Sequence, residues 1–75
     1  MNKYTAFYYC GTDYQLGNIV EVCTYDNKKY IGEIRDICDY DDHYHSAPVT
    51  SMLIKTRSDY VEVDDWQITD MRYIK

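Results

Sequence analysis

IVEVCTYDNKKYIGEIRDI, residues 19–37, decides the fold because it holds two runs of β-forming residues around a charged turn. Apolar and polar side chains alternate through residues 18–25, and this period of two predicts a strand. Residues 26–29, DNKK, supply turn formers followed by charges, as a short hairpin connection requires. The stretch therefore predicts an antiparallel hairpin.

The return strand, residues 30–38, has an ambiguous pattern. Its isoleucines at positions 31, 34 and 37 are three residues apart, a spacing that would also suit a helix. Gly32 inside the run would cost a helix about 1 kcal/mol relative to alanine, whereas in a strand glycine marks a bulge or a bend. We therefore expect a strand with a bulge at Gly32 that turns both Ile31 and Ile34 inward.

The remaining sequence predicts further short strands and turns. The expected strands are 4–9 (a strand or extended arm), 49–57, 60–64 and 71–74, with a connection at 11–17, a polar loop at 39–47 closed by Pro48, a tight turn at Ser58-Asp59 and one helical turn over 65–70. Five or six short strands, one short helical turn and no long amphipathic helix predict a single all-β domain covering residues 1–75. The expected form is a small antiparallel barrel, in which closure removes exposed strand edges.

Length and charge narrow the function classes. A chain of 75 residues forms one domain, and such a domain buries only about 60% of its unfolded surface, so a large substrate pocket is not expected. Thirteen acidic against eight basic residues give a net charge of −5. Binding to phosphate backbones needs clustered lysine and arginine, so nucleic acid is disfavoured unless the fold builds a local basic patch.

The cysteines and the N-terminal sequence favour a cytoplasmic protein. Three cysteines without a CxxC pair fit neither a disulfide framework nor a zinc ribbon, and predict reduced thiols. The first residues, MNKYTAFYYCG, lack the apolar region and cleavage site of a signal peptide, and no window is apolar enough for a membrane span.

The order of elements resembles the SH3-like and Sm-like small barrels, and within them the Rof-like (Rho-inhibitor) and YolD-like bacterial groups. The resemblance is carried by IVEVCTYDNKKYIGEIRDI at 19–37, LIKT at 53–56 and YVEVDDWQITDMRYI at 60–74, and it spans about three quarters of the chain. It is a pattern of strands and turns without a sharp motif. It implies a small acidic barrel that binds a protein partner on the partner's nucleic-acid-binding surface.

DYDDHYH, residues 39–45, raises the possibility of a metal site. In an extended segment Asp41, His43 and His45 would project to one side and could hold zinc or nickel with a fourth ligand from elsewhere. The stretch fails as a calcium loop because its sixth position is Tyr44 and its twelfth is Thr50. We expect no metal and no other cofactor, with this trio as the minority alternative.

No catalytic constellation stands out. Cys38 with His43 or His45 is the only nearby nucleophile and base, and no glycine-rich turn beside it could build an oxyanion hole. The expectation is a protein without enzymatic activity.

Two surfaces are candidates for binding instead. Carboxylates that steer a basic partner, interleaved with aromatic anchors, predict a protein-binding surface. Its expected residues are Asp39, Tyr40, Asp41, Asp42, Tyr44, Tyr60, Glu62 and Trp66.

The alternative is single-stranded RNA or DNA, bound by cations beside an aromatic platform. Its expected residues are Lys28, Lys29, Tyr30, Lys55 and Arg57. A third alternative is a homo-oligomer formed through leftover edge strands.

Overall fold

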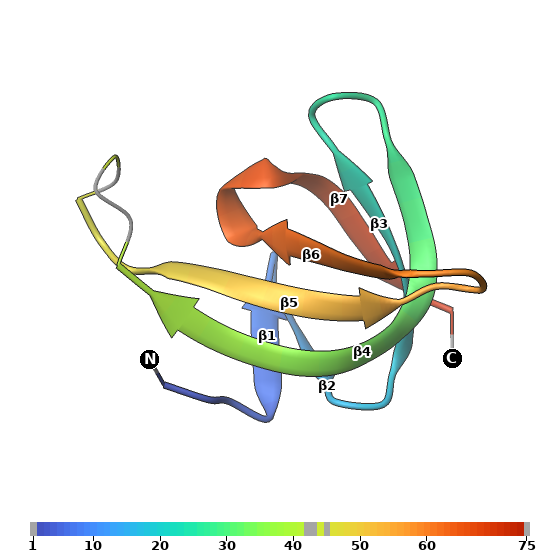
Figure 1. Cartoon of the computed structure of the whole chain (residues 1–75), viewed down its shortest axis with the longest axis horizontal. Coiled ribbons are helices and arrows are strands. Elements are labelled where there is room, and N and C mark those ends of the chain that lie inside the picture. The colour runs from blue at the N-terminus through green and yellow to red at the C-terminus, as the bar shows by residue number, and fades with distance from the viewer. Residues whose placement is uncertain (1, 42–43, 45, 75) are drawn as a thin grey trace.

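The computed structural model describes residues 2–41, 44 and 46–74, which form seven strands and one 3-10 turn. In chain order they are β1 (Ala6–Tyr9), β2 (Thr12–Gln15), β3 (Ile19–Thr24), β4 (Lys29–Tyr40), β5 (Val49–Lys55), β6 (Tyr60–Asp64), the 3-10 turn η1 (Asp65–Gln67) and β7 (Ile68–Tyr73) (Figure 1). The predicted all-β class is confirmed.

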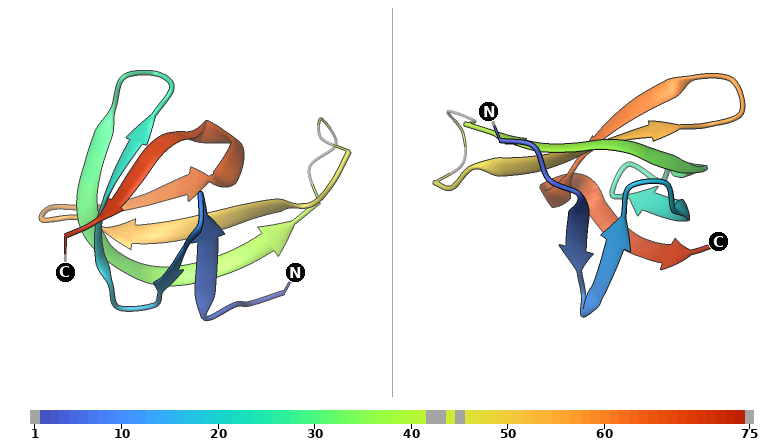
Figure 2. Two further views of the ribbon diagram at one scale, coloured as in Figure 1. Left: turned by 180° about the vertical axis from the view of Figure 1, so that it is seen from behind. Right: turned by 90° about the horizontal axis from the view of Figure 1, so that it is seen from below.

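The strands form two antiparallel sheets. β1 and β2 make a two-stranded sheet, and the other five strands follow the order β6-β5-β4-β3-β7. Backbone pairing among the described residues does not close the larger sheet into a barrel, since no ladder joins its edge strands β6 and β7. The hairpin β1–β2 lies against one side of the curved sheet (Figure 2).

β4 is the strand that links the two halves of the larger sheet. Its first residues pair with β3, from Lys29 opposite Cys23 to Glu33 opposite Ile19, and its later residues pair with β5. The register shifts between Ile34 and Asp36, where a β-bulge inserts an extra residue. β4 is longer than predicted, because the chain stays paired through Tyr40 instead of entering a loop at residue 39.

The expected bulge at Gly32 is wrong. Gly32 pairs in regular register with Val20, and the bulge follows Ile34. Ile34 and Ile37 are therefore both buried, whereas Ile31 is 49% exposed. A Cβ at position 32 would lie 2.7 Å from the carbonyl carbon of Lys55 and 2.9 Å from Ile54 Cγ2. Glycine is needed there for a close approach of two strands.

The N-terminal hairpin corrects a second expectation. Residues 11–17 were expected to form only a connection, yet Thr12–Gln15 forms β2 against β1. The two-residue turn between them, Cys10 at φ 48° and Gly11 at φ 86°, has the positive φ pair that a tight hairpin with a type I′ turn requires. The sequence signal was weak because the turn is Cys-Gly rather than Asn-Gly or Asp-Gly.

The core lies between the hairpin and the larger sheet. Its most deeply buried side chains come from β3, β4, β5 and β6, and Phe7 and Tyr14 join them from the hairpin. The fully buried side chains of the larger sheet are Val20, Val22, Ile34, Ile37, Met52, Ile54 and Val63. Two tyrosine hydroxyls of the hairpin donate to backbone carbonyls of edge strand β7, from Tyr14 to Met71 at 3.0 Å and from Tyr9 to Ile68 at 3.3 Å. These bonds attach the hairpin along that edge.

The C-terminal elements follow the expected order with shifted bounds. β6 has the predicted limits. The turn before it is centred on Arg57-Ser58, one residue earlier than the predicted Ser58-Asp59, because the backbone N–H of Thr56 donates to the carbonyl of Asp59 (2.8 Å). The predicted helical turn is the short η1, in which Gln67 Oε1 accepts from the backbone N–H of Asp64 at 2.9 Å. β7 begins three residues earlier than the predicted final strand.

In the part of the chain that the structure describes, no helix has the length and apolarity to span a membrane.

Candidate binding site

The residues before β1, Asn2 to Thr5, form an extended N-terminal arm that pairs with the end of β4. The N–H of Tyr4 donates to the carbonyl of Ile37 (2.9 Å), and the N–H of Asp39 donates to the carbonyl of Asn2 (3.0 Å). The Asp39 carboxylate in turn accepts the backbone N–H of Asn2 (3.0 Å) and the hydroxyl of Tyr4 (2.9 Å). These two bonds hold the arm and the Tyr4 side chain against Asp39 of β4.

The same bonds set the ionisation of both partners. The Asn2 backbone N–H, followed by the Tyr4 hydroxyl, lowers the pKa of Asp39 below its ordinary value. The bond to Asp39 raises the pKa of Tyr4, because losing the phenolic proton would place two negative charges together. Near neutral pH the pair is therefore an ionised carboxylate and a protonated phenol.

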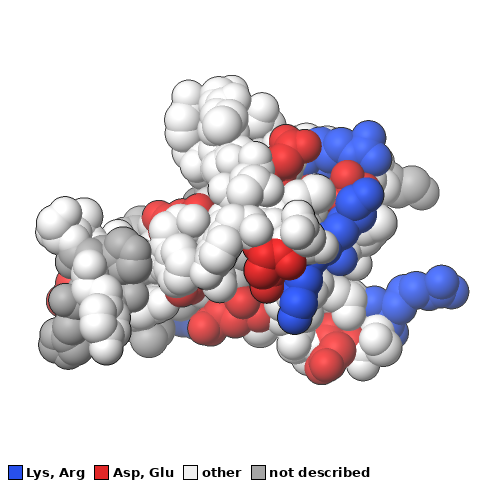
Figure 3. All heavy atoms as spheres, turned by 90° about the horizontal axis from the view of Figure 1, so that it is seen from above, with Lys and Arg blue, Asp and Glu red and all other residues white. Residues whose placement is uncertain are grey.

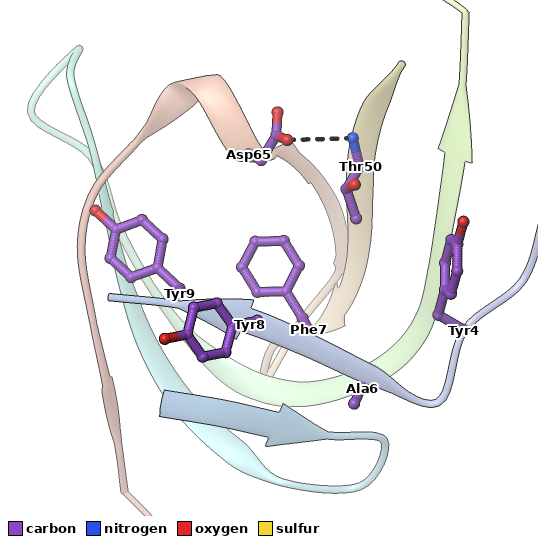
Figure 4. A pocket seen from close by; sticks show the side chains of 7 residues that line it. All are labelled: Tyr4, Ala6, Phe7, Tyr8, Tyr9, Thr50 and Asp65. Atoms are coloured by element: carbon purple, nitrogen blue, oxygen red, sulfur yellow. Dashed lines mark hydrogen bonds between the residues drawn. The ribbon is translucent and has the colours of Figure 1, made fainter. Parts of the chain in front are cut away.

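A cavity of about 290 Å³ opens between this arm, β1 and the β5–η1 side of the larger sheet. Four aromatic rings contribute to its walls, together with one carboxylate. The lining residues are Tyr4, Ala6, Phe7, Tyr8, Tyr9, Thr50 and Asp65. Figure 4 shows Asp65 and Thr50 across the opening from the β1 side chains, with the Phe7 ring pointing toward them. The backbone N–H of Thr50 donates to Asp65 Oδ2 at 3.4 Å, which orients this carboxylate.

β1 presents its outer backbone edge at the cavity. The N–H of Leu16 donates to the carbonyl of Thr5 (3.1 Å), so Thr5 is a hydrogen-bonded position of the hairpin. Hydrogen-bonded and non-hydrogen-bonded pairs alternate in an antiparallel ladder, so Ala6 and Tyr8 turn their N–H and C=O groups away from β2. Both residues line the cavity, which therefore offers main-chain groups beside aromatic rings.

Further carboxylates lie at the same end of the described structure as the cavity, and Asp65 is the one that lines it. Asp39 faces Thr50 across the β4–β5 ladder, and Asp64 accepts the hydroxyl of Tyr40 at 2.7 Å. Neither these two nor Asp41 and Asp65 form an ion pair with a lysine or arginine of the described residues. The lysine on the arm, Lys3, is bound to Asp36 at 2.5 Å. This end of the molecule, which we call the acidic end, is a favourable environment for a positive charge.

The structure brings together only part of the predicted protein-binding surface. Asp39, Tyr40 and Asp41 lie at the acidic end, and Tyr44 is 94% exposed in the loop beyond them. Asp42 lies outside the described residues. The other three predicted residues lie elsewhere: Glu62 within β6, Tyr60 under the ammonium of Lys55 (5.2 Å), and Trp66 against Tyr25 with ring centroids 5.8 Å apart.

The minority metal site cannot be assembled from the described residues. Asp41 is exposed, and His43 and His45 lie outside the part that the structure describes. Among residues 2–41, 44 and 46–74, no three histidine, cysteine, aspartate or glutamate side chains form a cluster able to hold a metal ion. The three cysteines of the chain are free thiols.

Three of the five residues predicted for nucleic acid line one cleft, at the opposite end of the sheet. Lys29, Tyr30 and Arg57 line a second cleft of about 690 Å³ between the start of β4 and the β5–β6 turn. Lys28 precedes Lys29, and Lys55 lies at the end of β5 beside this turn. Figure 3, which shares its horizontal axis with Figure 1, shows lysine and arginine side chains gathered over the end where the β5–β6 hairpin turns. We call this surface the basic cleft.

The sequence did not predict the cavity at the acidic end. Its lining includes Phe7, Tyr8 and Tyr9 of the aromatic run at 4–9, which predicted a strand but no binding role. Asp65 comes from the other end of the chain, and only the β4–β5–β6 pairing brings it beside the arm. The density of tyrosine before the first glycine was the available signal.

Comparison of the chain with protein-family models, with curated proteins and with solved structures finds no match. The function is therefore inferred from the geometry of the two ends.

Proposed function

We propose that this protein acts without catalysis, by binding a protein partner that presents a basic, extended segment to the acidic end. The observation that carries the proposal is the cavity between β1 and η1, where aromatic rings lie across the opening from Asp65 and, among the described residues, no lysine or arginine contributes to the lining. An arginine or lysine side chain of the partner would place its alkyl stem against Phe7 and Tyr8 and its charge near Asp65.

The edge of β1 supports an extended partner in particular. A peptide laid along it would receive main-chain hydrogen bonds from Ala6 and Tyr8, the mode in which exposed strand edges bind peptides. The cavity would then select the side chain, and the carboxylates at 39, 41, 64 and 65 would speed the approach of a basic partner. Basic extended segments are common on nucleic-acid-binding surfaces, so the protein would serve as an inhibitor or adaptor that occupies such a surface.

The fold is proposed to be a partly open member of the SH3-like and Sm-like barrels. Support comes from the strand order β6-β5-β4-β3-β7, from the bent β4 that belongs to both halves of the sheet, and from the short 3-10 turn between the last two strands. In this interpretation the β1–β2 hairpin covers the open side and forms the binding cavity with it.

Binding of arginine-rich and acidic peptides, followed by isothermal titration calorimetry at low and high salt, tests the proposal. Asp65→Asn keeps the shape and the acceptor for Thr50 N–H but removes the charge. Because one exposed charge pair contributes up to about 1 kcal/mol, we expect the affinity for the arginine-rich peptide to fall by about fivefold. Asp59→Asn is the matched control, since it removes the same charge beside the basic cleft and should leave this affinity unchanged.

A second pair of variants locates the aromatic contact. Tyr8 is 68% exposed, so Tyr8→Ala should fold normally and weaken peptide binding. Tyr44→Ala removes a ring from the neighbouring loop and should have no effect. Equal affinity for arginine-rich and acidic peptides, or loss of binding with Tyr44→Ala alone, would contradict the proposed site.

A further inference from the structure

The basic cleft has the composition of a site for an anion with a flat apolar part. Its lining is largely apolar, with Tyr30, Ile31 and Val61 between the positive side chains of Lys29 and Arg57. The cleft has a volume of about 690 Å³. Ile31 is 49% exposed in it, so its side chain can contact a ligand. That volume lies in the range of small-ligand sites, about 300–1,000 Å³.

Ion pairs compete only weakly for the cations at this cleft, although the Lys55 ammonium also donates to the carbonyl of Thr56 at 3.1 Å and lies 5.2 Å from the Tyr60 ring centroid. Neither Lys55 nor Arg57 makes an ion pair with any carboxylate among the described residues. Lys29 is 3.9 Å from Glu21, but that carboxylate is bound at 2.9 Å by the guanidinium of Arg72. Four of the eight lysines and arginines of this acidic chain line the cleft or are next to a lining residue in the sequence: Lys28, Lys29, Lys55 and Arg57.

One carboxylate opposes this charge and provides a test of it. Asp59 lines the cleft, and its Oδ1 accepts the backbone N–H of Tyr60 at 2.8 Å. The Asn side chain can keep that bond without the charge. Removing the charge should therefore strengthen the binding of an anion in the cleft without altering the turn.

We infer that the basic cleft binds a short single-stranded nucleic acid. Single strands alternate a flat apolar base with a phosphate, and proteins bind them by combining aromatic faces with a positive groove. Tyr30 and the apolar floor offer the surface for a base, and Lys29 and Arg57 line the same cleft for the phosphates, with Lys55 next to the lining residue Thr56 in the chain. This inference is independent of the proposed function, because the two sites use different residues at opposite ends of the sheet.

Fluorescence anisotropy of a labelled oligothymidylate of about eight nucleotides, a length within the site sizes of single-strand binders, tests the inference. The affinity should fall as salt rises, with a log–log slope near −2 for about three phosphate contacts. Arg57→Ala and Lys55→Ala should each weaken binding by about fivefold and reduce the slope by about 0.7. Ile31→Ser should weaken binding and leave the slope unchanged.

Matched controls separate the cleft from general charge effects. Arg35→Ala removes a cation that faces Glu33 at 3.8 Å on the same strand, and it should leave the affinity unchanged. Asp59→Asn should raise the affinity by about twofold to fivefold, an effect of one exposed charge. Asp65→Asn, which tests the acidic end, should have no effect. Circular dichroism of each variant confirms that it is folded.

Three results would overturn the inference. The first is no binding of the oligonucleotide at low salt. The second is equal competition by an acidic peptide or by inorganic phosphate, which would show that only charge is recognised. The third is a light-scattering mass of two copies at low salt that returns to one copy in Arg57→Ala, which would show that the cleft takes the acidic end of a second chain.

Discussion

Position 32 shows how one residue can determine the path of a strand. β4 passes the end of β5 so closely that the site has no room for a Cβ beside the Lys55 backbone. Glycine in a strand interior normally weakens the strand, but here it lets Ile34 and Ile54 pack in the same core. The sequence marked Gly32 as special; the reason is the neighbouring strand, which lies more than twenty residues further along the chain.

Gly32→Ala should therefore destabilise the fold. Forcing a methyl group against a backbone carbonyl requires the strands to separate, and overpacking of this kind costs about 1–3 kcal/mol. Urea denaturation should show a lower midpoint at an unchanged slope. Gly11→Asn is the control, because position 11 lies in open space and asparagine tolerates positive φ. A wild-type midpoint for Gly32→Ala would mean that the close approach is absent.

At the scale of the element, the N-terminal hairpin depends on tertiary contacts. A hairpin of two four-residue strands is marginal alone, and this one is joined to the rest by the burial of Phe7 and Tyr14 and by two hydroxyl bonds to β7. Its sequence, with Asp and Gln in β2, is a weak strand former. For this reason the local pattern predicted only a connection at 11–17.

Tyr14→Phe should weaken the attachment of the hairpin. The variant keeps the ring in the core but leaves the Met71 carbonyl without its 3.0 Å donor, which costs about 1–2 kcal/mol. Tyr8→Phe removes the same hydroxyl from an exposed ring on the same hairpin and should not change stability. Both are measured by thermal or urea unfolding. Equal stability of the two variants would argue against the bond to β7.

Strands with regular alternation were the best predicted elements. β6 has the predicted bounds and β3 differs only by one residue at each end, because their side-chain patterns follow the strand period directly.

The candidate sites were harder to predict than the strands. Asp39, Thr50 and Asp65 become neighbours through the β4–β5–β6 register, and no local pattern specifies that proximity. The basic cleft was better anticipated, since its cations lie in two turns that paired strands place together.

At the scale of the whole molecule, ionisation should couple to stability at acidic pH. The hydrogen bond from Arg72 Nε to Glu21 Oε2 (2.9 Å) lowers the pKa of Glu21. The bond from the backbone N–H of Asn2 likewise lowers the pKa of Asp39. A carboxyl whose pKa is lower in the folded state stabilises the fold above its unfolded pKa, about 4. This contribution is lost as pH falls through the folded-state value.

Glu21→Gln should accordingly flatten the rise of unfolding free energy with pH on the acidic side, and Arg72→Gln should flatten it similarly by removing the partner. The measurement is a series of urea unfolding curves from neutral to acidic pH. An unchanged pH dependence in both variants would show that the pair is not formed in solution.

The central claim is that the acidic end, rather than the basic cleft, receives a protein partner. Amide chemical-shift mapping during titration with an arginine-rich peptide tests it most directly. The account predicts that the largest shifts fall on Ala6, Tyr8, Thr50 and Asp65, with Lys29 and Arg57 unaffected. Shifts confined to the basic cleft, or no shifts under low-salt conditions, would contradict it.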